Sequence, residues 1–330
     1  MDSELSKAIL YAKQLIELQT LDQSLSVNPD EFSKFGRTYF TTNENINGYL
    51  EKVNLTEVKK ALTVLASGDH LFNLINNNIL DVDTFDLNYM AEYMALGLKR
   101  TMILKYSYTE YIEIMNKILS GKINTKQSME IIADLIPYME EKYKKFWQKI
   151  LDFSLKFFKK HHTLFNIFDL LSTDTNFYAN TFTEGSNDRL HKNNLFTISL
   201  ENYNRLKSQL VRANITFKQA NAVKLHKEFD STYDIILLSN ILSYFDLYWG
   251  RNWKYKKLHD YEEKLKKISN PDALIFLQYI FWYNGVNSIL FDYSKIYGFD
   301  LTDEEILSFK TNFDEKQERY SAAILHRVKK

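Results

Sequence analysis

The sequence predicts an α/β protein, a doubly wound, Rossmann-like sheet with a helical insertion or cap. Three observations lead to this class. Short apolar runs bounded by turn residues recur along the chain, and segments with helical apolar spacing separate them. The first two runs lie close enough to form one strand–helix–strand unit. Residues 233–239, YDIILLS, are almost continuously apolar, as is typical of a strand buried on both faces.

The first strand–helix–strand unit places a polar feature at the end of each strand. The apolar run 61–66 ends at the turn-forming Ser67-Gly68-Asp69, and residues 71–80 then have helical spacing. A second short strand over 82–87 ends near Asp86. We therefore expect a glycine turn and an acidic residue at the carboxyl edge of the sheet.

The rest of the chain supplies an insertion and further strands. Residues 89–105 are rich in helix formers, and 107–171 hold helical patterns too long for an ordinary crossover. Strands are expected at 215–219, 233–239, 273–278 and, next to a sheet edge, 320–328. The predicted parts are an N-terminal helical or lid segment (1–60), a ligand-binding sheet domain (61–106 with 196–330) and an inserted helical subdomain (107–195).

Composition excludes several functional classes. The 42 basic residues balance 42 acidic ones, so no global field attracts nucleic acid, and no such partner is expected. The chain lacks cysteine and its seven histidines lack the spacing of a helical metal pair, so no metal is expected. The first 14 residues lack a signal-peptide core and polar residues interrupt the most apolar run, 274–291, which favours a cytoplasmic protein.

The turn Ser67-Gly68-Asp69 favours a ligand without a pyrophosphate. A tight turn at a strand end lets backbone N–H groups approach a ligand, and Gly68 permits close contact. Its single glycine does not make the G-x-G-x-x-G pattern of dinucleotide sites. Such a turn suits S-adenosylmethionine, with Gly68 and Asp69 at the methionine end. The alternative is an ordinary β-turn.

Polar groups at other strand ends extend this hypothesis. Asp86 can accept hydrogen bonds from both ribose hydroxyls of an adenosine ligand, and Asn88 follows it. Asn221, after the third expected strand, is expected to bond the edge of the adenine ring. Ser239-Asn240, after the central strand, would lie beside the reacting carbon, with Tyr244 lining the same cleft. Roles as helix caps or loop formers are the alternatives.

Residues 142–162 interleave lysines with aromatic side chains. Two interpretations remain open for this amphipathic pattern. Its apolar face packs a core, or the helix lies on a lipid surface and makes the protein membrane-peripheral. A helix is not the open strand platform on which single-stranded nucleic acids stack.

Four segments carry a family resemblance: Ser67-Gly68-Asp69, Asp86-Leu87-Asn88, Leu98-Lys99 and Leu238-Ser239-Asn240. In this order they resemble the S-adenosylmethionine:diacylglycerol 3-amino-3-carboxypropyltransferases of betaine-lipid synthesis and their bacterial relatives. Upstream, Tyr39 and Glu44 match that family's Tyr-…-Trp-Glu-Asp segment, where Asn43 and Asn45 replace the Trp and the Asp. The resemblance spans roughly residues 37–112 and 195–282.

The resemblance implies a class I methyltransferase-like sheet and a transferase. The 3-amino-3-carboxypropyl group of S-adenosylmethionine would pass to a lipid or small-molecule acceptor, with release of methylthioadenosine. Glu44, Tyr39 or Tyr244 would orient or deprotonate that acceptor. Ser243 and Gln278 stand where the family often has Asp and Arg, which leaves the acceptor open. The alternatives are methyl transfer from the same pocket and a non-catalytic S-adenosylmethionine-binding interaction module.

Overall fold

A computed structural model describes residues 3–20, 38–42, 44–162, 165–171, 193–244, 255–283, 304–310 and 320–328. Contacts divide the chain into two compact units. The helical unit comprises Met1–Thr42, Leu65–Gly68 and Asp86–Asn187, and the sheet unit comprises Asn43–Val64, Asp69–Phe85 and Asp188–Lys330. The three-part division expected from the sequence stays a prediction.

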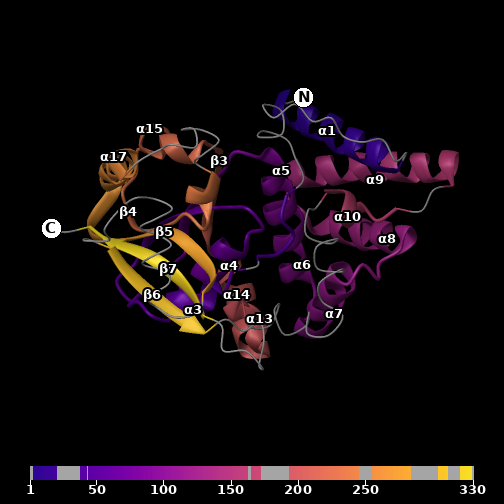
Figure 1. Ribbon diagram of the computed structural model, residues 1–330. Helices are drawn as coiled ribbons and strands as arrows, with labels where there is room; N and C mark the ends of the chain where they lie inside the picture. The colour runs from indigo at the N-terminus through magenta and orange to yellow at the C-terminus, as the bar shows by residue number, and fades with distance from the viewer. Residues whose placement is uncertain are drawn as a thin grey trace. The chain divides into compact units, whose positions relative to one another are not determined.

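A seven-stranded sheet has the order β3-β2-β1-β4-β5-β7-β6 (Figure 1). β1 (Lys60–Val64) pairs in parallel with β2 (Asp81–Asp86) and β4 (Tyr233–Leu237), and β4 pairs in parallel with β5 (Ser269–Tyr283). β7 (Tyr320–Arg327) runs antiparallel between β5 and β6 (Glu304–Lys310), and β3 (Asn214–Gln219) forms the other edge. This is a Rossmann order with one antiparallel strand inserted. The predicted class I methyltransferase-like fold is therefore confirmed.

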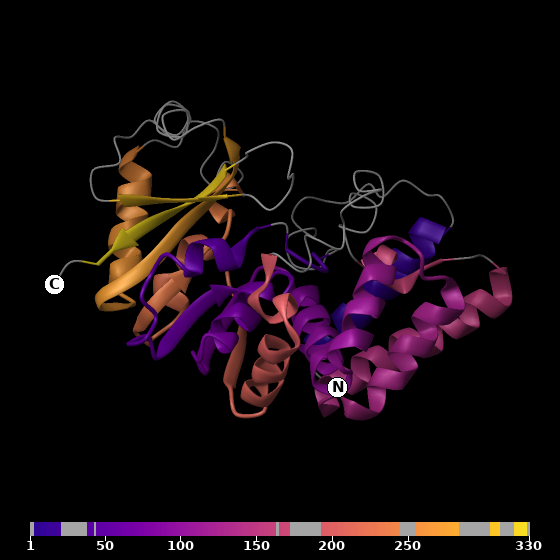
Figure 2. The ribbon, with the colours of Figure 1, turned by 90° about the horizontal axis from the view of Figure 1, so that it is seen from below.

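Helices of the sheet unit cover both faces of the sheet. α4 (Asp69–Asn76) packs against β1, α13 (Leu195–Ile198) and α14 (Leu200–Leu210). α17 (Tyr255–Lys266) contacts β5 and α15 (Leu225–Glu228). The crossovers from β1 to β2 and from β4 to β5 run in opposite directions along the sheet. Because such crossovers are right-handed, α4 and α17 lie on opposite faces (Figure 2).

Burial explains why the central strands were predictable. Successive residues of a strand point to opposite faces, and Ala61 and Leu62 of β1 are both 0% exposed. Ile235 and Ile236 of β4 are likewise 0% exposed. Strands covered on both sides carry apolar residues at every position, which is the pattern seen in the sequence.

The antiparallel end of the sheet differs from the prediction in two ways. β6 was not predicted, and it makes 320–328 the second strand from the edge, because β7 pairs with β5 on one side and β6 on the other. β5 is longer than the expected 273–278, since its pairing with β7 continues to Tyr283 opposite Tyr320. The last residues of the apolar run 274–291, from 284 onward, lie outside the described residues.

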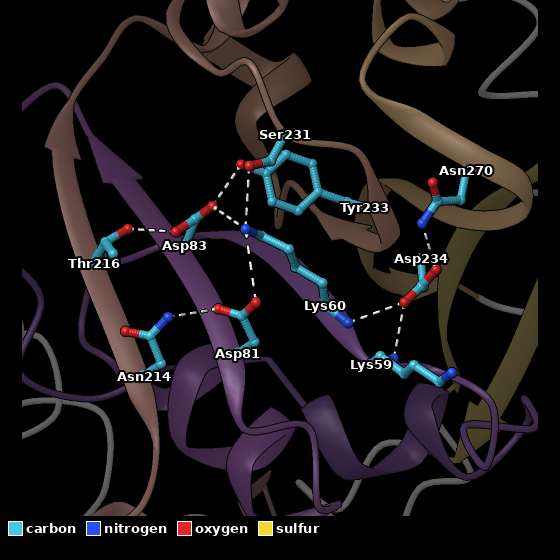
Figure 3. Close-up of polar contacts among 10 residues, drawn as sticks. All are labelled: Lys59, Lys60, Asp81, Asp83, Asn214, Thr216, Ser231, Tyr233, Asp234 and Asn270. Atoms are coloured by element: carbon cyan, nitrogen blue, oxygen red, sulfur yellow. Dashed lines mark hydrogen bonds and ion pairs between the residues drawn. The ribbon is translucent and has the colours of Figure 1, made fainter.

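Charged and polar side chains meet at the amino ends of the central strands (Figure 3). Lys60 Nζ lies 3.3 Å from Asp83 Oδ2 and 3.7 Å from Asp81 Oδ2. Asp234 Oδ2 accepts hydrogen bonds from the backbone N–H groups of Lys59 at 2.8 Å and Lys60 at 2.9 Å. These contacts pair the charges at the edge of the sheet opposite the carboxyl ends, and they tie β1, β2 and β4 together.

The helical unit consists of helices before and after the strand–helix–strand unit. They are α1 (Ser3–Thr20), α5 (Tyr89–Glu92), the π-helix η1 (Tyr93–Lys99), α6 (Arg100–Lys105), α7 (Tyr108–Leu119), α8 (Thr125–Leu135), the 3₁₀-helix η2 (Ile136–Tyr138), α9 (Glu141–His161) and α10 (Ile167–Leu171). α7 and α8 begin with capping boxes made by Ser107 with Glu110 and by Asn124 with Gln127. The helices predicted within 107–171 are confirmed.

The predicted helix over 89–105 contains a π-helical segment. Gly97 lies where a Cβ atom would come within 3.1 Å of Trp147 Nε1 and of the Tyr143 side chain. The missing Cβ lets α9 approach, and the Trp147 indole N–H donates to the carbonyl oxygen of Tyr93 at 3.1 Å. That bond supplies a partner for a carbonyl at the start of the π segment.

α9 carries the mixed pattern of 142–162. Its apolar side chains, including Phe146, Trp147 and Phe157, are buried, and the helix contacts α1, α8 and η1. The core-packing interpretation is therefore confirmed for this face. Seven lysines lie exposed on the remaining surface of the helix: Lys142, Lys144, Lys145, Lys149, Lys156, Lys159 and Lys160. Among the described residues, no helix combines the length and the apolar character needed to cross a bilayer.

Candidate functional site

The direction of the crossovers reverses between β1 and β4, which are paired neighbours in the sheet. In open α/β sheets, ligands bind outside the carboxyl ends of the strands at this switch point. The chain leaves β1 at Val64 and leaves β4 at Leu237. The predicted site residues Ser67-Gly68-Asp69 and Ser239-Asn240 follow these two strand ends directly.

The glycine turn, Leu65–Gly68, belongs to the helical unit. Its closing bond runs from the N–H of Gly68 to the carbonyl oxygen of Leu65 at 2.6 Å. Ala66 has a φ of 42° and Gly68 a φ of 82°, both in the left-handed region. Gly68 adopts this conformation without the penalty that a Cβ atom brings.

Asp86 is held beside this turn by backbone donors of the same unit. Its Oδ2 accepts the N–H of Ala66 at 3.0 Å, and its Oδ1 accepts the N–H of Asn88 at 2.8 Å. A carboxylate has about four lone-pair sites, so the group can still accept a hydroxyl hydrogen beside its backbone donors. Loss of water around Asp86 raises the pKa of its carboxyl to about 6, although hydrogen bonds from Asn88, Ala66 and Leu87 act in the opposite direction.

Lys99 supports the turn from within the helical unit. Its side chain is 1% exposed, and Nζ donates to the carbonyl oxygens of Phe40 at 3.0 Å and Ser67 at 3.2 Å. Lys99 therefore connects the backbone at Phe40 with the glycine turn. Tyr39, next to Phe40, is 46% exposed.

In the sheet unit, Glu44 joins two segments that follow β1 and β4. Its Oε2 lies 3.0 Å from Nε2 of His70, the second residue of α4, and its Oε1 accepts a hydrogen bond from the Ser239 hydroxyl. Glu44 and His70 are each 2% exposed, while Ser239 is half-buried. We call Glu44, His70 and Ser239 the Glu44 cluster.

Ser239 and Glu44 are fixed by Tyr279 of β5. The backbone N–H of Tyr279 donates to the carbonyl oxygen of Ser239 at 3.0 Å, and its hydroxyl accepts the N–H of Asn45 at 3.0 Å. Burial raises the pKa of Tyr279 above its ordinary value, so this phenol is neutral at neutral pH. Ser239 itself has a φ of 58°, a left-handed conformation that is uncommon for a residue other than glycine.

The other predicted residues make local contacts. Asp69 is fully buried at the start of α4, and Asn88 caps α5 by accepting the N–H of Met90 at 2.9 Å. Asn221 caps the 3₁₀-helix η3 (Ala222–Lys224) through the N–H of Val223 at 3.1 Å. Asn240 is half-buried, with its Oδ1 3.4 Å from the Ser239 hydroxyl. Tyr244 ends the 3₁₀-helix η4 (Ile241–Tyr244), and its side chain lies outside the described part of the chain.

The structure brings together Glu44 with Ser239, and Asp86 with Asn88 and the glycine turn. Sequence analysis did not single out His70, although it directly follows Asp69 in the turn motif. It named Lys99 only within a family motif. Across the described residues, no group of His, Asp and Glu side chains is arranged to hold a metal ion.

Comparison with known proteins yields likenesses to solved structures alone. No protein-family model matches the chain, and no curated protein sequence matches it. The solved structures that resemble it include the crystal structure of TehB from Haemophilus influenzae, at 14% sequence identity and a TM-score of 0.20. The aligned part covers 39% of this chain and 47% of the TehB chain, so the chain spans less than half the length of TehB. A likeness of this size carries no information on function.

Proposed function

We propose that the protein is an S-adenosylmethionine-dependent transferase. The observation that carries this proposal is the Asp86 carboxylate, which ends β2 beside a single-glycine turn and accepts hydrogen bonds from the backbone N–H groups of Ala66 and Asn88. In doubly wound sheets an acid at this place accepts hydrogen bonds from ribose hydroxyls. The orientation of Asp86 does not depend on a flexible partner, so the group is prepared for such a ligand.

The glycine turn supports the same class of ligand. It offers backbone N–H groups without the three glycines that a pyrophosphate needs. A ligand that combines an adenosine ribose with an uncharged or cationic link therefore fits better than a dinucleotide. S-Adenosylmethionine has this chemistry, and its sulfonium makes the attached carbons open to nucleophilic attack.

The transferred group follows from the resemblance to the aminocarboxypropyltransferases. An acceptor nucleophile would attack the γ-carbon of the methionine part, and methylthioadenosine would leave. Since the sulfonium is already a good leaving group, the protein's contribution is alignment and removal of the acceptor's proton. Glu44 is the residue that we assign to the acceptor side, with a lipid or a small molecule as acceptor. Methyl transfer is the second candidate.

A ligand titration tests the proposal. Calorimetry and thermal unfolding with S-adenosylmethionine would compare wild type with Asp86→Asn and with Asp260→Asn, which changes an exposed aspartate of α17. Ligand at about 100 times its dissociation constant should stabilise wild type by roughly 2.7 kcal/mol. We expect Asp260→Asn to keep this shift and Asp86→Asn to lose most of it.

The by-product then identifies the reaction. Methylthioadenosine indicates aminocarboxypropyl transfer, and S-adenosylhomocysteine indicates methyl transfer. Binding without either product across lipid and small-molecule acceptors would favour a non-catalytic binding module. Absence of binding by folded, ligand-free wild type would reject the transferase.

A further inference from the structure

The Glu44 cluster contains a histidine with one satisfied and one unsatisfied ring nitrogen. Nε2 of His70 contacts Glu44 at 3.0 Å, whereas Nδ1 is buried and has no hydrogen-bond partner among the described residues. A buried polar atom without a partner costs about 1–3 kcal/mol. Such an atom is therefore an indication that a ligand group completes the site.

The Glu44 carboxylate determines which nitrogen carries the proton. An ionised carboxylate only accepts hydrogen bonds, so Nε2 of His70 must donate to it. In the neutral ring, Nδ1 then presents a lone pair. Held in this way, the ring presents Nδ1 as the atom that can accept a proton.

The side chains of the Glu44 cluster are arranged as in enzymes that use a histidine as a base. A buried carboxylate fixes the ring through one nitrogen and stabilises the imidazolium that forms, while the other nitrogen accepts the proton. Ser239 donates to the second oxygen of Glu44 and so fixes the carboxylate in turn. His70 and Ser239 follow β1 and β4 within the sheet unit, at the switch point where doubly wound sheets bind ligands.

We infer that His70 is the catalytic base of the proposed transferase and that Glu44 is its positioning residue. The inference rests on the proposed function and changes the role of Glu44 within it. As the acceptor atom forms its bond to the carbon of S-adenosylmethionine, the carbon–sulfur bond breaks with its electron pair going to sulfur. The acceptor's proton passes to Nδ1 of His70, and solvent later takes it. The acceptor atom must therefore carry both a lone pair and a proton, as a hydroxyl or a neutral amine does.

Burial of His70 sets a condition on this step. The residue is 2% exposed, so an acceptor reaches Nδ1 only by displacing the protein atoms around it.

Nitrogen-15 NMR of histidine-labelled protein tests the ring directly. His70→Gln assigns the His70 signals, and His259→Gln, at a 53% exposed side chain, is the matched control. We expect wild type at neutral pH to show His70 protonated at Nε2 and bare at Nδ1. Glu44→Gln should lose this single tautomer, because an amide can either accept from or donate to Nε2. A charged His70, or a proton on Nδ1 alone, would overturn the inference.

Turnover provides the second test, with a short-chain diacylglycerol and a primary amine as acceptor probes. His70→Gln should lower kcat about 10²-fold or more while the calorimetric Kd for S-adenosylmethionine stays within about twofold. A His70→Gln enzyme with wild-type kcat would reject the base role. Failure of wild type to bind S-adenosylmethionine would instead reject the proposed function. If neither probe is consumed, the tautomer measurement decides.

Discussion

Tyr233 donates its hydroxyl hydrogen bond to Asp83 at 2.7 Å, and this contact crosses β1, because Tyr233 begins β4 and Asp83 lies on β2. Lys60 of β1 lies between them, 3.3 Å from the same carboxylate. Burial alone would raise the pKa of Asp83, but hydrogen bonds from Thr216 and Tyr233 and the charge of Lys60 outweigh it and lower that pKa. Because Thr216 lies on β3, this one carboxylate connects four adjacent strands.

Asp83→Asn should destabilise the protein at neutral pH and much less in acid. A carboxyl whose folded pKa lies below its unfolded value stabilises the fold above about pH 4, and this contribution disappears as pH falls through the folded pKa. We expect a loss of about 1–3 kcal/mol in the free energy of unfolding at pH 7. Urea unfolding at pH 7 and pH 3 measures it. Asp81→Asn, at a 39% exposed side chain, should cost less than about 1 kcal/mol; equal losses in the two variants would contradict the assignment.

Affinity for S-adenosylmethionine should rise with pH in a way that depends on Asp86. Ribose hydroxyls donate to the ionised carboxylate, and with a pKa of about 6 this form is the minor one at pH 5. Affinity should therefore increase roughly tenfold between pH 5 and pH 7, whereas Asp86→Asn should show no such rise. Calorimetry at pH 5, 6 and 7 checks this. Parallel pH profiles of wild type and variant would show that Asp86 does not contact the ligand.

Asp86 should also affect stability in the absence of ligand. Its folded pKa is raised above the ordinary 3.8, so the folded state binds this proton more tightly than the unfolded chain does. The contribution of Asp86 to stability is then greatest in acid and decreases as pH rises from about 4 to 6. Asp86→Asn should gain stability relative to wild type over this interval, as measured by urea unfolding. A constant difference across the interval would argue against the raised pKa.

Ser239 should tolerate glycine better than alanine. Both variants lose the hydrogen bond to Glu44, but only glycine removes the left-handed penalty, about 1–2 kcal/mol for other residues. Ser239→Gly should therefore be more stable than Ser239→Ala by about 1 kcal/mol in thermal or urea unfolding. At Ser208, exposed on α14, the order should reverse, because glycine weakens a helix relative to alanine. The same order at both positions would contradict a strained Ser239.

Peripheral membrane contact, if it occurs, should depend on the lysines of α9 and not on its buried aromatic side chains. Wild type should sediment with phosphatidylglycerol vesicles at low salt, and changing Lys156, Lys159 and Lys160 to Gln should weaken this binding by about 1 kcal/mol per lysine. A matched control triple changes the exposed Lys117, Lys122 and Lys126 to Gln. Wild type that stays in solution, or equal effects of the two triples, would end the membrane interpretation.

The sequence predicted the strands whose two faces are buried and also the edge strand β3, but it did not predict the edge strand β6. β1 and β4 have apolar residues throughout, so their runs stand out. Among the described residues β6 pairs with β7 alone, and it begins with Glu304 and Glu305, a composition that does not indicate a strand. An edge strand is specified by its partner, β7, more than by its own pattern.

The sequence indicated which strand ends contribute to the candidate site, but it did not indicate the side-chain contacts within that site. The turn and Asp86 follow directly from the strand–helix–strand unit. The contact of Glu44 with His70 joins residues 26 positions apart that share no helical or strand periodicity. This contact arises from tertiary packing, and no local pattern in the sequence predicts it.

The π-helical segment Tyr93–Lys99 determines how this helix would respond to the deletion of a residue. A π turn holds one residue more than an α turn, so it acts as a single-residue insertion absorbed within a helix. Each residue rotates an α-helix by about 100°, and deleting one residue before position 99 would turn the Lys99 side chain by that angle relative to the preceding turns. Its ammonium group would then point away from the carbonyl oxygens of Phe40 and Ser67. The rotation of this helix about its own axis therefore determines whether Lys99 stays hydrogen-bonded to the glycine turn.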